Sequence, residues 1–292
     1  MALRDILVGL DRSTAGEGHL KLALNLAHVH RAHLTACYIM RGEHGGSAGM
    51  PVNLGPGIIV APEVLAPAGE LLPATIPGIS REAERAENVE QLFWSELRLH
   101  GIDGEWHLLS PGETATLIDL SKSFDLIILG QLSPDACADG LRPDEIIVAT
   151  GRPVLVVPYA GSFDTVGRRA LVAWDGSREV VRALNDALPL LENAEAVTVM
   201  FVGARQRSLE EHHPSLERIV RHLQRRGIDA KPEETPQGDI AISDVLLSRA
   251  ADFAADLIVS GAYHHSQLRE ALIGGVSRDL LEHMTVPILM SH

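Results

Sequence analysis

The chain has 292 residues, of which 46% are hydrophobic, 22% charged and only 4% aromatic, a composition typical of one large globular domain or two of ordinary size. Its formal net charge of −14 argues against nonspecific binding to nucleic acid or to an anionic membrane, because both require clustered positive charge. Two widely separated cysteines, no signal-peptide pattern and no apolar run of transmembrane length favour a cytoplasmic protein.

The first half of the chain alternates short apolar runs, typical of strands buried on both faces, with segments of helical period. The expected strands are 5–10, 32–40, 105–109, 124–130 and 153–158, and the expected helices are 17–31, 80–99, 113–123 and 143–150. Residues 41–79 are rich in glycine and proline and follow no period. Their apolar side chains favour a segment that covers an apolar surface over a flexible lid.

The same order of elements begins again at Arg169. The expected strands are 170–174, 196–202, a weak one near 230, 256–261 and 286–290, and the expected helices are 178–191, 209–226 and 240–254, with a short one after 274–275. Asp125-Leu-Ile recurs as Asp256-Leu-Ile, and Gly101-Ile-Asp recurs as Gly227-Ile-Asp. Such a repeat predicts two homologous domains, 1–160 and 167–292, of which the first carries 41–79 as an insertion.

Alternating strands and helices imply right-handed crossovers and parallel sheets covered on both faces. We therefore expect the α/β class, with two tandem, doubly wound domains of five parallel strands each. Ligands of such sheets bind beyond the carboxyl ends of the strands, where the strand order reverses. Asp175 and Gly261 both follow predicted strands, so they are expected to meet in one crevice.

Four segments of the second half occur in an order and at a spacing that resemble the universal stress protein family, specifically its tandem two-domain members. They are Val172-Ala-Trp-Asp-Gly-Ser177, Asp256-Leu-Ile-Val-Ser-Gly261, Gly274-Gly-Val-Ser277 and Val286-Pro-Ile-Leu-Met290. The resemblance implies the adenine-nucleotide alpha-hydrolase-like fold. It also implies that the apolar last strands of the two domains pair with each other, as an internal pseudo-dimer, and that a further homodimer forms.

Members of this family that bind ATP carry Gly-x-x-Gly, nine residues, and then Gly-Ser or Gly-Thr. Here Gly261 and Gly274 keep the pattern, whereas His264 and Gly275 depart from it, and Ser277 follows two positions later. The resemblance implies a nucleotide site in the second domain, for ATP with Mg²⁺, formed by Ala173, Trp174, Asp175, Val202, Gly261, His264, Gly274, Gly275, Val276 and Ser277. Asp175 would lie near the ribose or base, Val202 beside the adenine, and Gly274 to Ser277 around the phosphates.

The departures weaken this site without abolishing it. Gly275 keeps a backbone N–H donor and loses only a hydroxyl, and one hydrogen bond to a charged phosphate is worth about 1.5–3 kcal/mol. In the first domain Leu141, Arg142 and Pro143 follow Gly140. Because proline has no N–H donor and several aspartates lie nearby, we expect that domain to bind no nucleotide.

Other functions have weaker support in the sequence. Asp175 could serve as a helix N-cap instead of a ligand contact. The adjacent histidines at 212–213 and 264–265 match no metal-binding pattern, and Ser177 and Ser277 have no His/Asp partner by spacing. We therefore expect neither a metal site nor a catalytic residue. The expected function is a stress-response regulatory or protective module; the alternatives are a nucleotide-free protein-interaction module of the same fold and a weak ATP hydrolase.

Overall fold

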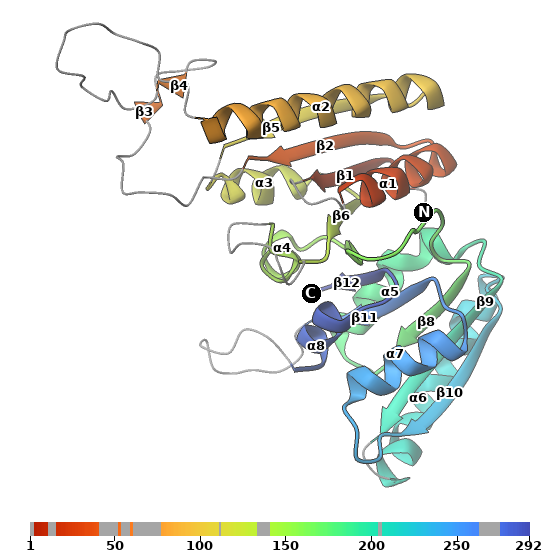
Figure 1. Cartoon of the computed structure of the whole chain (residues 1–292). Coiled ribbons are helices and arrows are strands. Elements are labelled where there is room, and N and C mark those ends of the chain that lie inside the picture. The colour runs from red at the N-terminus through yellow and green to blue at the C-terminus, as the bar shows by residue number, and fades with distance from the viewer. Residues whose placement is uncertain are drawn as a thin grey trace, which may run out of the picture.

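The computed structural model describes residues 3–10, 16–40, 52–53, 59–60, 77–110, 112–132, 141–203, 206–262 and 275–292. One ten-stranded sheet runs through both halves of the chain, and helices cover it (Figure 1). The short strands β3 and β4 form a separate two-stranded sheet. None of the helices in the described ranges combines the length and hydropathy that a membrane span requires.

The elements follow one another in the same order in the two halves. The first half contains β1 Asp5–Leu10, α1 Gly16–His30, β2 His33–Ile39, β3 Val52–Asn53, β4 Ile59–Val60, α2 Pro77–His100, β5 Gly104–Leu109, α3 Thr114–Ser121, β6 Leu126–Gly130, α4 Pro143–Thr150 and β7 Val154–Val157. The second half contains β8 Arg169–Ala173, α5 Arg178–Leu191, β9 Ala196–Gly203, α6 Gln206–Arg225, β10 Ala230–Pro236, α7 Ile242–Asp252, β11 Leu257–Gly261, α8 Gly275–His283 and β12 Ile288–Ser291.

The predicted elements are all present, and their ends differ by a few residues. Helix α2 begins at Pro77, inside the segment expected to be irregular, because proline fits the first turn of a helix. Strands β3 and β4 also lie in that segment. The sequence did not predict them because two-residue strands are too short to leave a pattern. Whether the rest of 41–79 covers an apolar surface lies outside the described residues.

The strands lie in the order β10-β9-β8-β11-β12-β7-β6-β1-β2-β5. Neighbouring strands within each half are parallel. In the second half the chain runs outward from β8 through β9 to β10 and then returns to β11 on the other side of β8. The strand order therefore reverses between β8 and β11, where ligands of doubly wound sheets bind.

The two halves join through their last strands. Strand β7 pairs antiparallel with β12, in a register that places Leu155 opposite Leu289. Gln131, which follows β6, adds a polar link, since its side-chain amide donates to the carbonyls of Leu281 and Glu282 at 2.9 and 3.0 Å. The sheet order and this pairing confirm the predicted fold class, with parallel five-stranded sheets packed as an internal pseudo-dimer.

Apolar cores lie on both faces of the sheet. One core packs α1, α2, α5 and α6 against side chains such as Val8 and Val259. The other packs α3, α4, α7 and α8 against side chains such as Leu7 and Ile258. Successive strand residues thus point to opposite faces, and the strands are apolar throughout because both faces are covered.

The repeated Asp-Leu-Ile motif ties two neighbouring strands together at their amino ends. The carboxylate of Asp256 accepts hydrogen bonds from the backbone N–H groups of Gly167, Arg168 and Arg169, at 3.1, 3.1 and 2.9 Å. In the first half, Asp125 similarly accepts from the amides before and at the start of β1. The motif is therefore structural, and it lies at the end of the sheet away from the carboxyl edge.

The repeated Gly-Ile-Asp motif ends a helix. Gly101 and Gly227 have φ values of 63° and 82°, a left-handed conformation that glycine adopts at low cost. The next residues, Ile102 and Ile228, donate back to carbonyls in the last turns of α2 and α6. Both repeated motifs are thus explained by the fold and carry no information about a ligand.

Candidate functional site

The carboxyl ends of β8, β9 and β11 bring the predicted site residues of the second half to one edge of the sheet (Figure 1). Ala173, the last residue of β8, pairs with Met200 of β9 on one side and with Ser260 of β11 on the other. Val202 lies two residues beyond Met200, and Gly261 is the next residue after Ser260. The sheet register therefore places Ala173 at the centre of this edge.

The loop after β8 is ordered by its own polar side chains. The carboxylate of Asp175 accepts from the N–H of Ser177 at 2.9 Å, and the hydroxyl of Ser177 accepts from the N–H of Val180 at 3.2 Å. Ser177 is therefore the N-cap of α5, while Asp175 shapes the turn before it and stays exposed. An exposed carboxylate held in place by the backbone is well placed to accept hydrogen bonds from ribose hydroxyls.

Only the backbone of Trp174 lies at this edge, because its side chain points to the face of the sheet opposite to that of Ala173. The ring is 5% exposed, packs in the core beneath α5 and α6, and donates from Nε1 to the hydroxyl of Ser215 at 3.3 Å. The alternation of a strand explains this position, because Ala173 and Trp174 are consecutive and must point in opposite directions. Ala173 packs instead on the face that α7 and α8 cover.

Gly261 is required by the close approach of α5. A Cβ atom built on Gly261 would lie 2.6 Å from the backbone nitrogen of Val180 and 3.0 Å from the Cβ of Glu179. Any other residue at this position would push the first turn of α5 away from β11. The glycine predicted to let a phosphate approach the backbone therefore also has a packing reason to be there.

Helix α8 begins at the same edge with Gly275, Val276 and Ser277. Gly275 is exposed, and a Cβ atom built at this position would meet no atom within 4 Å. Val276 packs with Val202 and Ala173 against one apolar core, and Ser277 is buried. The start of a helix concentrates unpaired N–H groups and positive potential. His264 and Gly274 lie outside the described residues.

Two arginines near the edge already have acidic partners. The guanidinium of Arg178 hydrogen-bonds the buried carboxylate of Glu179 at 2.5 Å, and that of Arg278 bonds Glu282 at 2.6 Å. These hydrogen bonds, with the attraction of the negative charges, raise the pKa of both arginines. Glu179 was not predicted from the sequence, although an acidic residue just after an N-cap is a recognisable signal. The backbone N–H groups of α8 thus remain the main candidates for binding phosphate.

The corresponding edge of the first half is more crowded. The ring of His19 lies over Gly130, so that a Cβ at Gly130 would be 2.2 Å from it. Helix α4 starts at Pro143, which has no N–H donor, and Arg142 is paired with Asp144. His19 has no sequence signal of its own, because its position above the strand depends on how α1 packs. The loss of the first-half site stays a prediction.

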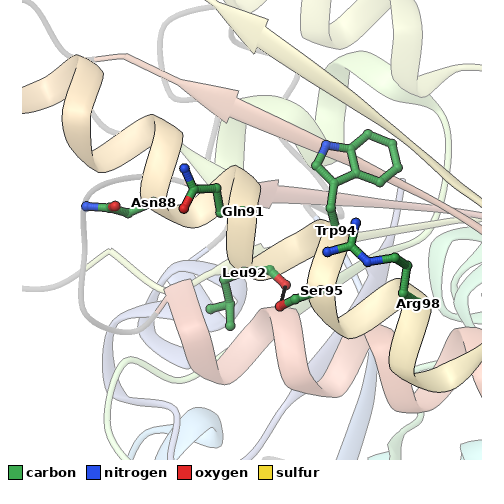
Figure 2. A pocket seen from close by; sticks show the side chains of 6 residues that line it. All are labelled: Asn88, Gln91, Leu92, Trp94, Ser95 and Arg98. Carbon is green, nitrogen blue, oxygen red and sulfur yellow. Dashed lines mark hydrogen bonds between the residues drawn. The ribbon is translucent and has the colours of Figure 1, made fainter.

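A pocket of about 630 Å³ lies elsewhere, on the outer side of α2 (Figure 2). Its lining residues are all on that helix: Asn88, Gln91, Leu92, Trp94, Ser95 and Arg98. None of the predicted nucleotide-site residues lines it. Within the described ranges no group of three or more His, Cys, Asp and Glu side chains is arranged to hold a metal ion.

Comparisons with known proteins agree with this fold. A family model described as the universal stress protein family matches residues 167–292. Universal stress protein Slr1230 of Synechocystis sp. is 26% identical over 193 residues, which are 59% of this chain and 60% of that protein. The matched region therefore spans less than two thirds of that relative.

Solved structures resemble the chain over nearly its whole length. A universal stress protein from Archaeoglobus fulgidus DSM 4304 aligns with a TM-score of 0.71 and 15% identity, over 99% of this chain and 96% of that one. A functionally unknown protein from Pseudomonas aeruginosa PAO1 aligns with a TM-score of 0.61 and 17% identity, over 99% and 92% of the two chains. Residues 167–292 therefore match the universal stress protein family, and the whole chain shares the fold of a solved universal stress protein.

Proposed function

We propose that this protein is a stress-response regulatory or protective module that binds an adenine nucleotide, with ATP as the expected ligand, in its second domain, residues 167–292. One observation carries the proposal. The strand order reverses between β8 and β11, and two residues expected to contact ATP, Ala173 and Gly261, lie at the carboxyl ends of these paired strands, with Asp175 two residues after Ala173. The start of α8 supplies N–H donors at the same edge.

The proposal gives a role to five of the described residues. Val202 and Ala173 offer an apolar surface for the adenine, and Asp175 offers an exposed acceptor for ribose hydroxyls. Gly275 and Val276 direct backbone N–H groups toward the phosphates. Mg²⁺ would be held mainly by the phosphates themselves, and Asp175 is the one carboxylate among the predicted site residues; Mg²⁺ in nucleotide sites usually takes only one or two protein carboxylates.

Isothermal titration calorimetry with ATP and Mg²⁺ tests this proposal on Gly275→Asp and Gly275→Asn. A Cβ atom built on Gly275 meets no atom within 4 Å, so the position accepts a side chain at its first carbon. Aspartate in the first turn of a helix is favourable for folding, so a loss of binding cannot be attributed to unfolding. We expect Gly275→Asp to weaken binding by at least about tenfold through repulsion of the phosphates. The uncharged Asn variant is expected to bind nearly as tightly as wild type. Equal heats for the Asp variant and wild type would refute the site.

The pairing of Arg178 and Arg278 with glutamates favours a second candidate, a nucleotide-free interaction module. In that case the edge would already be electrostatically balanced and would gain little from a phosphate. Native mass spectrometry of the purified protein separates the two candidates. A copurified nucleotide mass supports ATP binding, whereas its absence together with no calorimetric heat supports the second candidate. We propose no catalytic residue, and expect phosphate release from ATP to stay at the uncatalysed rate.

A further inference from the structure

The ten-stranded sheet ends at two outermost strands, β10 and β5, each of which has one side without a neighbouring strand among the described residues. These two edge strands differ in their capacity to pair with another strand. The N–H of Val197 donates to the carbonyl of Asp229, so every second residue counted from Asp229 faces β9 and those between face outward. Pro232 and Pro236 occupy outward-facing positions. Proline offers no N–H there, and such residues protect an edge from pairing.

The β5 edge carries no such protection. The N–H of Leu34 donates to the carbonyl of Asp103, and that of Met40 donates to the carbonyl of Leu109. By the same alternation, three residues of β5 direct their backbone N–H and C=O groups outward: Gly104, Trp106 and Leu108. No strand within the described ranges pairs with this side of β5. The side chain of Leu108 is also exposed, at 49%.

The β5 sequence, Gly-Glu-Trp-His-Leu-Leu, complements itself in the antiparallel direction. If a two-fold axis passes beside Trp106, Gly104 of one copy lies opposite Leu108 of the other. On the opposite face, Glu105, which lies 3.5 Å from His107 of its own strand, then also lies opposite His107 of the second copy. The leucine thus lies opposite the one residue of the strand that has no side chain, beside Phe93 and Leu97 of α2, which pack over Gly104. These pairings would form about six backbone hydrogen bonds between the copies.

Helix α2 supplies a matching surface above this edge. Glu87, Gln91, Trp94 and Arg98 are spaced four, three and four residues apart, so they share one side of the helix. Figure 2 shows Trp94 on the opposite side of the helix from Leu92. Phe93 contacts both Trp94 and the Trp106 ring of β5, which places this part of α2 over the middle of the strand. A two-fold axis beside Trp106 therefore brings Arg98 of one copy near Glu87 of the other.

We propose that β5 is the interface through which two copies of this chain associate, extending the sheet from ten to twenty strands. The occupant is a second copy because the strand complements itself in hydrogen bonding and in the placing of Glu105 opposite His107. The sheet pairing between β7 and β12 is internal to one chain, so those strands are not available for this contact. The interface lies in the first half of the chain, away from the proposed nucleotide edge, and does not depend on nucleotide binding.

Sedimentation equilibrium of the full chain tests this interface. We expect wild type to reach twice the monomer mass of 31.5 kDa as its concentration rises. Leu108→Pro removes one outward N–H donor and leaves the hydrogen bonds to β2 in place. Because the dimer is two-fold symmetric, the same hydrogen bond is lost in both copies. It should raise the dimer dissociation constant by about a hundredfold. Leu108→Lys should have a similar effect, and it remains informative if the proline variant fails to fold. Ile240→Lys is the matched control, since Ile240 is another exposed apolar residue, at 56%.

Charge reversal and hydrogen exchange complete the test. Glu105→Lys should weaken the dimer, and the double variant Glu105→Lys/His107→Glu should restore it, because the exchanged charges still face each other. In wild type, exchange at the amides of Gly104, Trp106 and Leu108 should slow as dimer forms. A monomer at every concentration, a dimer unaffected by both Leu108 variants, or protection of these amides in the monomer by another part of the chain would overturn the proposal.

Discussion

Replacement of Asp256 by alanine should destabilise the protein more than any other single change at an exposed or half-buried aspartate that the structure describes. Its carboxylate accepts three backbone N–H groups, from Gly167, Arg168 and Arg169, at 3.1, 3.1 and 2.9 Å. Hydrogen bonds to a charged acceptor are worth about 1.5–3 kcal/mol when buried. Because water can reach part of these amides, we take about 1 kcal/mol for each bond and expect a loss of about 3 kcal/mol.

Two further variants make this prediction specific. Asp125→Ala removes two such bonds at an exposed position, at 2.7 and 3.2 Å, and should cost about 1–2 kcal/mol. Asp252→Ala is the control, since Asp252 is exposed and lies 3.9 Å from Arg249, a pair worth less than about 0.5 kcal/mol. Urea unfolding followed by circular dichroism gives all three free energies. If Asp256→Ala were no more destabilising than Asp252→Ala, the repeated motif would not stabilise the sheet as argued.

Three other predictions follow from single residues. Gly261→Ala should destabilise the protein by about 1–3 kcal/mol and lower its melting temperature, because the added methyl group collides with the first turn of α5. Gly275→Ala should change the melting temperature little. Equal effects of the two variants would contradict the close contact between Gly261 and α5. Burial raises the pKa of Cys37 to about 12, so in a variant whose other cysteine is serine, a thiol reagent at pH 8 should react only after unfolding. Burial lowers the pKa of His30 below 6.5, against an opposing effect of Glu192. The unfolded chain then binds more protons than the folded one, so the contribution of neutral His30 to stability is full above pH 6.5 and declines as the pH falls below it. An NMR titration that gives a pKa above 6.5 for His30 would contradict this.

Much of the fold could be predicted because strands and helices leave local patterns in the sequence. Apolar runs, helical periods and two recurring motifs predicted the order of the elements, and the resemblance to the universal stress protein family predicted the pairing of β7 with β12. The bonds made by Asp125 and Asp256 explain why the motif recurs. It recurs because both halves need the same junction between neighbouring strands. The sequence does not reveal this reason, since it depends on which backbone N–H groups the carboxylates accept from.

The site was harder to predict, since its features depend on contacts between distant segments. Trp174 was grouped with its neighbours in the motif, yet strand alternation turns its ring into the opposite core. Gly261 was attributed to phosphate approach, and the structure adds the contact with α5. His19 is distant in sequence from Gly130, over which its ring lies in the first half. Helix packing sets such contacts, and no short pattern records it.

A crystal structure grown with ATP and Mg²⁺ tests the central proposal most directly. We predict density for the nucleotide between β8 and β11, with the adenine beside Val202, the ribose near Asp175 and the phosphates at the start of α8 near Gly275. Nucleotide density elsewhere, for example in the pocket on α2, would contradict the assignment of the site. No density at saturating ATP, in crystals whose carboxyl edge is open to solvent, would contradict nucleotide binding in the second domain.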